Sequence, residues 1–398
     1  MADNNENKVL NVPHLRFPEF SGEWNKYTIN DLATVVGGGT PDTTVKSYWG
    51  GDIQWFTPSE IGKNKYVDFS KRTITRDGLD NSSAKLLPLH TILLSSRATV
   101  GECSIASNEC TTNQGFQSLI AKQCNIDFLY YLIQTKKKDL IRNACGSTFL
   151  EISANEIRKI KVAVPVQNEQ EQIAKLLSLI DERIATQNKI IERYESLIRG
   201  INQYAFTNTG INYKLGEICE IRSGYSGNQL TLKNGLKVSR IETISGHKVN
   251  MERVGYVAPF ESSENYRLQI GDILFSNINS VEYIGNTAFI DKDYNLYHGM
   301  NLLRLIPKKE LVMPFYLYLV LNTNRLLNHF KTVCNKAVSQ ASINQTELGK
   351  TIVRIPNLMN QNRICELFQT LYTKLEAERY FISLLQDQKQ HLLRQMFI

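Results

Sequence analysis

The stretch Pro165-Val-Gln-Asn-Glu-Gln-Glu-Gln-Ile-Ala-Lys-Leu-Leu-Ser-Leu-Ile-Asp181 opens a heptad pattern that continues to Phe206. Apolar residues recur there in alternating steps of four and three, which is the a/d seam of a coiled-coil helix. A single helix over 168–206 would be about 58 Å long at ~1.5 Å per residue. The seam positions are Ile173, Leu177, Ile180, Ile184, Gln187, Ile191, Tyr194, Ile198 and Ile201.

The same pattern returns without a gap from Pro356 to Phe397. Both seams turn polar at one matching register, Gln187 and Glu378, and polar seam residues fix register and partner. Two separate amphipathic helices on local cores would explain part of this pattern. A long, narrow and repeated seam instead favours an antiparallel coiled coil between the two helices. The second seam is Ile364, Phe368, Leu371, Leu375, Glu378, Ile382, Leu385, Lys389 and Leu392.

The duplication extends to the segments before the helices. The pattern at 27–32 returns at 213–218, 87–95 returns at 268–276, and 128–132 returns at 315–319. Glycines match as well, because Gly38, Gly101 and Gly115 correspond to Gly224, Gly285 and Gly299. The offset between copies drifts, so a common frame carries loops of different length, and recognition usually resides in such loops.

Each copy combines strands and helices. Short apolar runs at 91–95, 160–165, 272–276 and 351–356 predict strands, while 127–141 and 314–330 have helical spacing. We therefore predict an α+β protein with pseudo-two-fold symmetry. Its expected parts are a polar segment (1–23), a first domain (24–166), a central helix (167–206), a second domain (207–356) and a C-terminal helix (357–398).

Composition limits the functional classes. The net charge is +7, and residues 207–356 alone hold 17 basic and 12 acidic side chains, which suits a modest attraction to phosphates. The 7 cysteines form no Cys-x-x-Cys pair, so we expect reduced thiols and no bound metal. There is no apolar run of transmembrane length and no signal peptide at the start, and we therefore expect a cytoplasmic protein.

Motifs that carry catalysis are missing from the sequence. There is no phosphate-binding loop, no His-Glu-x-x-His and no Gly-x-Ser-x-Gly elbow. Gly37-Gly38-Gly39 leads to Thr40-Pro41 and not to a helix, so it predicts a turn and not a dinucleotide loop. We expect no enzyme activity and no cofactor in this chain. Two roles remain open: a DNA-reading protein, and a coiled-coil scaffold with two protein-binding domains.

Several segments together resemble specificity subunits of type I restriction–modification enzymes. They are Val12-Pro-His-Leu-Arg-Phe-Pro-Glu-Phe20 with Gly22-Glu-Trp24, Ser95-Ser-Arg-Ala-Thr-Val-Gly101, Asn113-Gln-Gly-Phe116 and the helical stretch 165–181. The resemblance covers the whole chain, including the duplication.

The resemblance implies that each globular domain is a target-recognition domain that reads one half of a split, asymmetric site in double-stranded DNA. The helices would set the gap and dock two modification (methyltransferase) subunits, which carry the S-adenosylmethionine chemistry. Restriction and translocase subunits would join them. The second helix departs from the pattern, since Asn360, Asn362 and Tyr372 stand where Glu169, Glu171 and Asp181 are expected.

Base reading needs Arg, Lys or neutral polar side chains on exposed loops. In the first domain we predict DNA contacts for Lys63, Asn64, Lys65, Arg72, Arg76, Arg97, Ser147 and Thr148. In the second domain we predict them for Tyr225, Ser226, Asn228, Lys237, Arg240, Asn277, Asn279, Ser280, Tyr283, Asn335, Lys336, Gln340 and Ser342.

Overall fold

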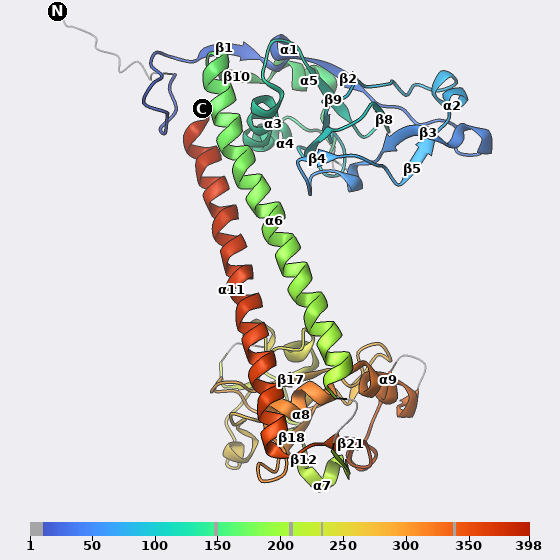
Figure 1. Ribbon diagram of the computed structural model, residues 1–398, viewed down its shortest axis with the longest axis vertical. Coiled ribbons are helices and arrows are strands. Elements are labelled where there is room, and N and C mark those ends of the chain that lie inside the picture. The colour runs from blue at the N-terminus through green and yellow to red at the C-terminus, as the bar shows by residue number, and fades with distance from the viewer. Residues whose placement is uncertain (1–10, 147–149, 207–209, 232–233, 337–339) are drawn as a thin grey trace, which may run out of the picture. The chain divides into compact units, whose positions relative to one another are not determined.

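The computed structural model describes residues 11–146, 150–206, 210–231, 234–336 and 340–398. The chain divides into two compact units, residues 1–189 with 380–398, and residues 190–379. Two long helices, α6 (Gln167–Ala205) and α11 (Leu358–Met396), each contribute a segment to both units (Figure 1). Each unit is therefore a globular domain combined with parts of both helices.

The first domain is built from many short strands around a few helices. Its elements are β1 (Asn25–Thr28), α1 (Ile29–Leu32), β2 (Ala33–Gly37), β3 (Trp49–Phe56), β4 (Tyr66–Val67), β5 (Arg72–Ile74), α2 (Arg76–Asp80), β6 (Ile92–Leu94), β7 (Cys103–Ala106), β8 (Cys110–Thr112), β9 (Gln117–Ala121), α3 (Ile126–Thr135), α4 (Lys137–Arg142), α5 (Ala154–Lys159) and β10 (Lys161–Val164). The main sheet has the order β2-β9-β6-β7-β4, and smaller sheets pair β1 with β10 and order β5-β3-β8.

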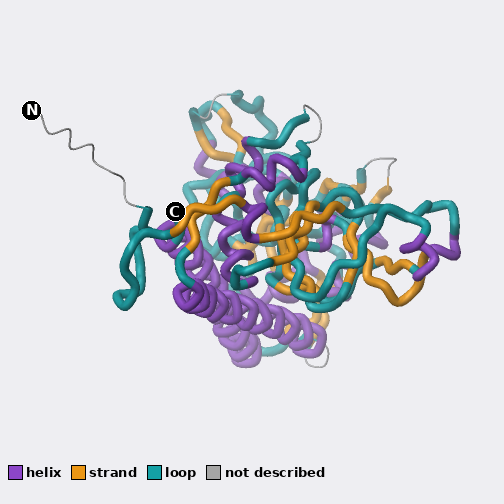
Figure 2. Tube along the Cα trace, turned by 90° about the horizontal axis from the view of Figure 1, so that it is seen from above, coloured by secondary structure: helices purple, strands orange, loops and turns teal. Residues whose placement is uncertain are grey.

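The second domain repeats this frame. Its elements are β11 (Ile211–Lys214), α7 (Leu215–Ile218), β12 (Cys219–Ser223), β13 (Leu236–Val238), β14 (Gly255–Val257), β15 (Ile273–Phe275), β16 (Ile278–Asn279), β17 (Thr287–Phe289), β18 (Leu303–Pro307), α8 (Pro314–Leu321), α9 (Asn324–Val333), β19 (Asn335–Lys336), β20 (Ala341–Ser342), α10 (Gln345–Gly349) and β21 (Ile352–Ile355). The sheet β12-β18-β15-β17 and the pair β11-β21 correspond to β2-β9-β6-β7 and β1-β10. The α+β duplication predicted from the sequence is thus confirmed. In Figure 2 long loops, drawn in teal, connect the short strands, drawn in orange.

The matched glycines occupy matched backbone positions. Gly101 and Gly285 have φ of +88° and +84°. Residues with a Cβ rarely adopt this left-handed backbone conformation. A Cβ on Gly38 would lie 2.0 Å from the carbonyl oxygen of Asn113, and one on Gly224 would lie 1.9 Å from that of Gly299. The glycine repeat therefore marks the same tight backbone sites in both frames.

The stretches with helical spacing, 127–141 and 314–330, are helical in the structure, but each is divided into two helices. They are α3 with α4 in the first copy and α8 with α9 in the second. In the second copy the hydroxyl of Thr323 accepts a hydrogen bond from the amide of Leu326 and so caps a new helix. In the first copy α3 ends at Thr135 and α4 begins at Lys137, so Lys136 alone separates them.

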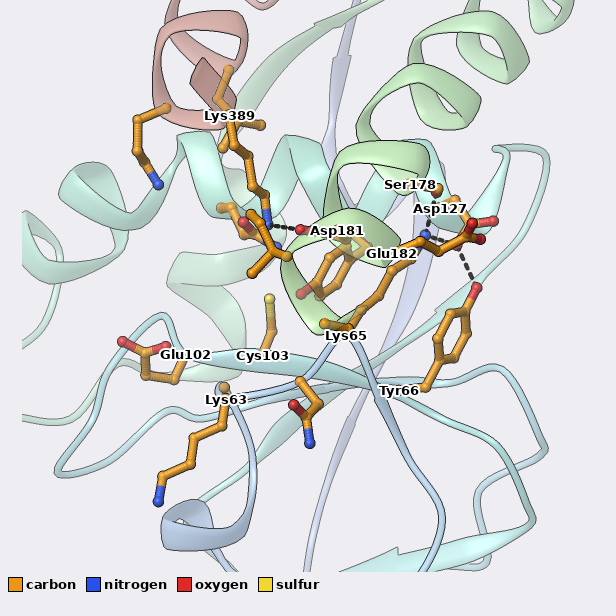
Figure 3. A pocket seen from close by; sticks show the side chains of 18 of the residues that line it. Lys63, Lys65, Tyr66, Glu102, Cys103, Asp127, Ser178, Asp181, Glu182 and Lys389 are labelled. Atoms are coloured by element: carbon orange, nitrogen blue, oxygen red, sulfur yellow. Dashed lines mark hydrogen bonds and ion pairs between the residues drawn. The ribbon is translucent and has the colours of Figure 1, made fainter. Parts of the chain in front are cut away.

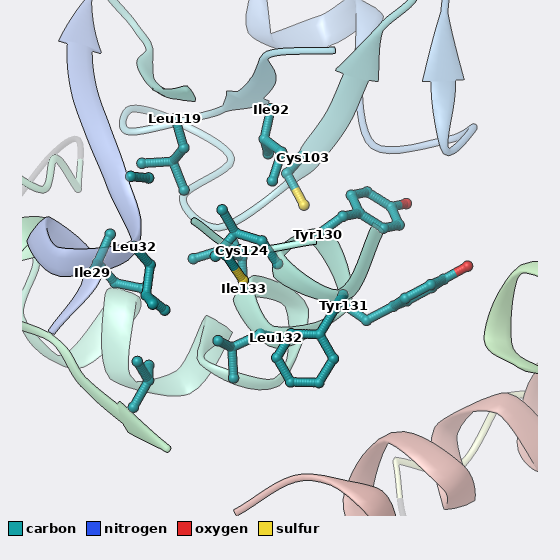
Figure 4. Close-up of a cluster of buried hydrophobic side chains, with 14 of the residues drawn as sticks. Ile29, Leu32, Ile92, Cys103, Leu119, Cys124, Tyr130, Tyr131, Leu132 and Ile133 are labelled. Carbon is teal, nitrogen blue, oxygen red and sulfur yellow. The ribbon is translucent and has the colours of Figure 1, made fainter. Parts of the chain in front are cut away.

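The core of the first domain lies where α3 packs on the main sheet. Ile29 and Leu32 from α1, Ile92 from β6 and Leu119 from β9 are fully or almost fully buried against α3 (Figure 4). The core does not stop at the domain boundary, because it also includes side chains of both long helices. These are Ile173, Ala174, Leu177, Leu393 and Met396, together with Phe397 just after α11.

In the first unit the two helices run antiparallel. Lys389 of α11 pairs with Asp181 of α6, with its Nζ 2.7 Å from Oδ1. Earlier residues of α6, such as Leu177, share a core with later residues of α11, such as Leu393. This is the packing predicted from the heptad pattern.

In the second unit the helix segments are also antiparallel. Arg379 of α11 donates a hydrogen bond of 2.6 Å to Glu195 of α6, whereas Phe206, just after α6, contacts Phe368 of α11. Across both units the predicted seam residues are buried or half-buried. The buried ones are Ile173, Leu177, Ile180, Gln187, Ile198, Phe368, Leu371, Leu375 and Leu385, and the half-buried ones are Ile184, Ile191, Tyr194, Ile201, Ile364, Glu378, Ile382, Lys389 and Leu392.

One glutamine near the start of each long helix holds the adjacent domain in the same way. The Oε1 atom of Gln170 accepts a hydrogen bond from the amide of Asn125 at the start of α3, and its Nε2 donates to the carbonyl of Pro165. Gln361 accepts from the amide of Met313 at the start of α8 and donates to the carbonyl of Pro356. Both amides are buried. Each helix is therefore clamped to its domain at a matching point.

Glu169, which is replaced by Asn360 in the second copy, has a role inside the first unit. Its carboxylate is fully buried and accepts two hydrogen bonds of 2.7 Å from the Arg16 guanidinium. The indole of Trp24 donates a third, of 3.3 Å. Arg16 also donates to the carbonyl of Gly22, so this pair fixes the segment before β1 on α6.

We predict that Glu169→Gln lowers the free energy of unfolding of the first unit by about 3 kcal/mol, because the Arg16 charge loses its buried partner. Urea titration followed by tryptophan fluorescence measures this, since Trp24, Trp49 and Trp55 are the 3 tryptophans of the chain. The control Glu156→Gln breaks the exposed pair with Lys159 and should cost less than about 0.5 kcal/mol. Equal small losses would contradict the structural role of Glu169.

The second domain contains a buried histidine directly before Gly299. His298 is 1% exposed, and its Nε2 lies 3.0 Å from the carbonyl oxygen of Leu302. Burial lowers the pKa of His298 to about 4, whereas an unfolded histidine titrates near ~6.5. The folded state therefore binds this proton less tightly than the unfolded state does.

We predict that the second unit loses up to about 3 kcal/mol of stability as the pH falls from ~6.5 toward ~4, and that this stability is fully present above ~6.5. Hydrogen exchange of the β18 amides at several pH values measures the loss. His298→Gln should flatten this pH dependence, whereas His391→Gln on the exposed surface of α11 should leave it unchanged. An unchanged slope in His298→Gln would contradict the assignment.

Candidate nucleic-acid interface

A small sheet in the second domain brings together polar residues that are distant in the sequence. β16 pairs with β20 and β20 pairs with β19, which aligns Asn279 with Ala341 and Lys336 with Ala341. Asn335 and Ser342 are directly opposite each other, and the Asn335 and Lys336 side chains are exposed. Segments separated by more than fifty residues thus form one small sheet, which we call the β16–β20–β19 sheet.

The turn after β16 adjoins this sheet. Asn279 donates to the hydroxyl of Ser276 and accepts from the amide of Ser280, so its amide group has a fixed orientation. Tyr283 and Ser280 are exposed, and so is Gln340. The Oδ1 atom of Asn277 is buried without a hydrogen-bond partner among the described residues. Predicted DNA contacts of the 277–283 and 335–342 groups are therefore neighbours.

The first domain places Arg97 at the corresponding point. Arg97 follows β6 and forms a bridge with Glu151, which in turn bridges to Cys145. The Arg97 guanidinium is about half exposed and pairs with the Glu151 carboxylate at 2.5 Å. Ser147 and Thr148 lie outside the described residues. The two copies thus share one arrangement. The segment after β6 contacts the segment before α5 in the first copy, and the segment after β15 contacts the segment before α10 in the second.

The other predicted contacts of the first domain lie on separate parts of it. Lys63 and Asn64 are exposed in the loop before β4. Arg72 lies over the Trp49 ring, with its Cζ 3.6 Å from the ring centroid, and Arg76 pairs weakly with Asp80 on α2. No hydrogen bond or ion pair among the described residues joins them to Arg97, and their DNA contacts stay a prediction.

Lys65 differs from its neighbours because it turns inward. Its side chain is 8% exposed, and its Nζ lies 2.7 Å from Asp127 Oδ1 and 2.6 Å from Ser178 Oγ. It borders a cleft of about 950 Å³ between the 62–66 loop, α3 and the two long helices (Figure 3). A phosphate contact by Lys65 would require this ion pair to break.

The segment 224–228 of the second domain, which contains Gly224 and Gly227, contributes to an aromatic cluster that could be identified from the sequence only in part. The Tyr225 ring stacks on Phe260 with 3.8 Å between ring centroids, and Tyr266 meets both rings edge-on. Ser226 and Asn228 are exposed beside it. Lys237 is exposed within β13, and Arg240 is exposed two residues after that strand ends. Phe260 and Tyr266 lie far along the chain from Tyr225, and no spacing signal connects them.

Among the described residues, no group of His, Cys, Asp or Glu side chains is arranged to hold a metal ion. All seven cysteines are free, and burial raises the pKa of the Cys103, Cys110 and Cys124 thiols to about 12. No helix in the described part of the chain has the length and apolar character needed to cross a membrane.

Comparison with known proteins adds an independent result. A family model described as the type I restriction modification DNA specificity domain matches residues 21–196 and 211–381. The type I restriction enzyme MjaIX specificity subunit of Methanocaldococcus jannaschii is 39% identical over 182 residues, 43% of this chain and 41% of that relative. The putative MjaX specificity subunit of the same organism is 38% identical over 188 residues, 46% of this chain and 44% of that relative. The chain thus spans less than half the length of these curated relatives.

A solved structure supports the fold. A type I restriction-modification system S subunit from M. genitalium aligns with 97% of this chain and 99% of that chain, with a TM-score of 0.59 at 17% identity. At this identity the likeness concerns the fold alone. The family model, by contrast, matches both copies over most of the sequence, and the chain therefore belongs to the type I restriction modification DNA specificity domain family.

Proposed function

We propose that this chain is the DNA-specificity subunit of a type I restriction–modification complex, in which each domain reads one half of a split, asymmetric duplex site. The observation that carries this proposal is that two matching frames present different polar surfaces at the same place. The β16–β20–β19 sheet offers Asn279, Asn335 and Lys336, while the first domain offers Arg97 beside Glu151. Two domains that share a frame but present different polar residues suit a DNA site with two different halves.

The chemistry of the complex is assigned to other subunits in this proposal. The long helices set the spacing between the readers and dock two modification subunits, and S-adenosylmethionine binds to those subunits. Restriction and translocase subunits join the assembly in the cytoplasm. This chain itself would have no turnover.

Exposed apolar residues on α11, outside the buried seam, support the docking role. Tyr380, Phe381 and Leu384 are 66%, 43% and 45% exposed, while the seam residues Ile382 and Leu385 on the same helix are half-buried and buried. Exposed apolar residues gathered on one helix face mark protein interaction sites. We propose that a modification subunit covers these residues.

We predict that Asn279→Ala changes base preference in one half of the site only, by about 1–3 kcal/mol at one position. Lys336→Ala should weaken binding to all sequences and lower the salt dependence, as expected for a phosphate contact. Binding to a panel of single-base variants at fixed salt measures both effects. Lys309→Ala, an exposed lysine in the turn before α8, is the control. A change in both halves, or in neither, would argue against a reader at this sheet.

We further predict that Tyr380→Ser with Leu384→Ser weakens association with the modification subunit by about tenfold or more, because buried aromatic anchors dominate interfaces. Co-purification followed by titration calorimetry measures the affinity, and Gln388→Ala at an exposed polar position of α11 is the control. Equal affinities for both variants would place the docking surface elsewhere.

A further inference from the structure

The first domain contacts the long helices through the apolar core that includes Leu177 and Leu393, and also through polar contacts at two points. The first point is the Gln170 clamp at the start of α6. The second point involves Ser178 and Asp181, which lie 8 and 11 residues further along the helix, or about 12–17 Å at ~1.5 Å per residue. Apolar packing is not directional, so polar contacts at a point distant from the clamp restrict the angle that packing alone leaves adjustable.

The second point is a network of charges and not an apolar contact. The Tyr131 hydroxyl of α3 donates a 2.7 Å hydrogen bond to Asp181 of α6, and Asp181 also pairs with Lys389 of α11 at 2.7 Å. Lys65, from the loop before β4, binds Asp127 and Ser178. Figure 3 shows Lys65 and Lys389 approaching the helix from different elements.

The Tyr131 ring connects the two halves of this network. The Lys65 Nζ lies 4.9 Å from its centroid and the Lys389 Nζ lies 5.5 Å from it, both within the range of cation–π attraction. The ion-pair side chains are only 8% to 29% exposed. Partly buried charges with several partners each permit few arrangements, because every displaced partner would leave a charge unpaired.

The second copy has a different contact at the matching point. Tyr318, which matches Tyr131, packs on Phe315 and Phe289, and Tyr372 replaces the acid at the position of Asp181. Tyr372 meets Phe315 edge-on at 6.5 Å between centroids. The nearby ion pair between Lys248 and Glu376 is exposed on both sides. The Tyr318 hydroxyl donates its 3.0 Å hydrogen bond to the carbonyl of His247 within the second domain and not to a helix carboxylate. The contacts of Tyr372 and Glu376 with the domain are apolar or exposed, and apolar contacts are less directional than ion pairs, so this junction specifies its angle less strictly.

We propose that Lys65, Tyr131, Asp181 and Lys389 are positioning residues that fix the angle of the first domain on the helix pair, and so restrict the gap accepted between the two half-sites. The inference rests on the proposed function, because a gap exists only if each domain reads one half. It assigns gap selectivity mainly to the first junction.

The test uses the full chain in complex with its modification subunit and a set of duplexes with constant half-sites and gaps that differ by single base pairs. Lys65→Met keeps the length and apolar stem of the side chain but removes its charge. We expect the preference of this variant for the best gap over the adjacent gaps to fall by about tenfold, with both half-site preferences unchanged. Lys248→Met, at the exposed pair of the second copy, should keep the wild-type gap profile.

Two results would overturn the positioning role. A uniform loss of affinity at every gap, with a weaker salt dependence, would show that Lys65 contacts phosphate. An unchanged gap profile would show that the network does not control the angle. Should Lys65→Met fail to fold, Asp181→Asn retains the shape of the side chain and weakens the same network, and it should give the same broadened profile.

A second readout separates this inference from the proposed function. Hydrogen exchange at residues 62–66 should rise in Lys65→Met and remain unchanged in Lys248→Met, whether or not DNA is bound. If the wild-type complex selects no split site, the proposed function fails, and exchange still decides whether Lys65 holds the loop. If a split site is found but neither the gap profile nor the exchange changes, only the positioning role fails.

Discussion

Burial of the apolar seam shared by α6 and α11 is the constraint on which the rest of the structure depends. Long helices gain most of their stability from packing and little from intrinsic propensity. Here the seam is covered by the partner helix and also by the domains. Leu177 and Leu393 belong to the same core as α3, and Phe368 and Leu371 share a cluster with Leu319 of α8. The helices are therefore part of the domain cores and not appended arms. Any reader carried by a domain is fixed to the helices by the same burial that folds them.

Much of the frame could be predicted from the sequence because it is periodic and repeated. The strands β6, β10, β15 and β21 lie within the predicted runs, and α6 begins and ends within one residue of the expected bounds. The breaks between α3 and α4 and between α8 and α9 were missed, because the apolar spacing continues across them. The break at Thr323 depends on a single capping hydroxyl, which a periodic pattern does not register.

The side-chain roles were harder to predict because they depend on partners far along the chain. Glu169 binds Arg16, which is 153 residues away in the sequence. The residues around Glu169 give no sign of this partner, so the sequence could not show why the second copy lacks the glutamate. Lys65 follows the exposed residues Lys63 and Asn64 in the sequence, but its own side chain is buried in an ion pair with Asp127. Conversely, Asn279 and Lys336 were proposed separately, and only the pairing of β16 with β20 and β20 with β19 brings them together. The DNA-contact assignments themselves stay a prediction.

Whether two unlike readers act on one duplex is measured most directly by selection from a random duplex library by the chain assembled with its modification subunit. The salt concentration must be fixed, because phosphate contacts make affinity strongly salt-dependent. We expect enrichment of one split motif, with two unlike halves at a constant gap. Enrichment of no motif by a complex shown to be assembled would contradict the proposal that each domain reads one half-site.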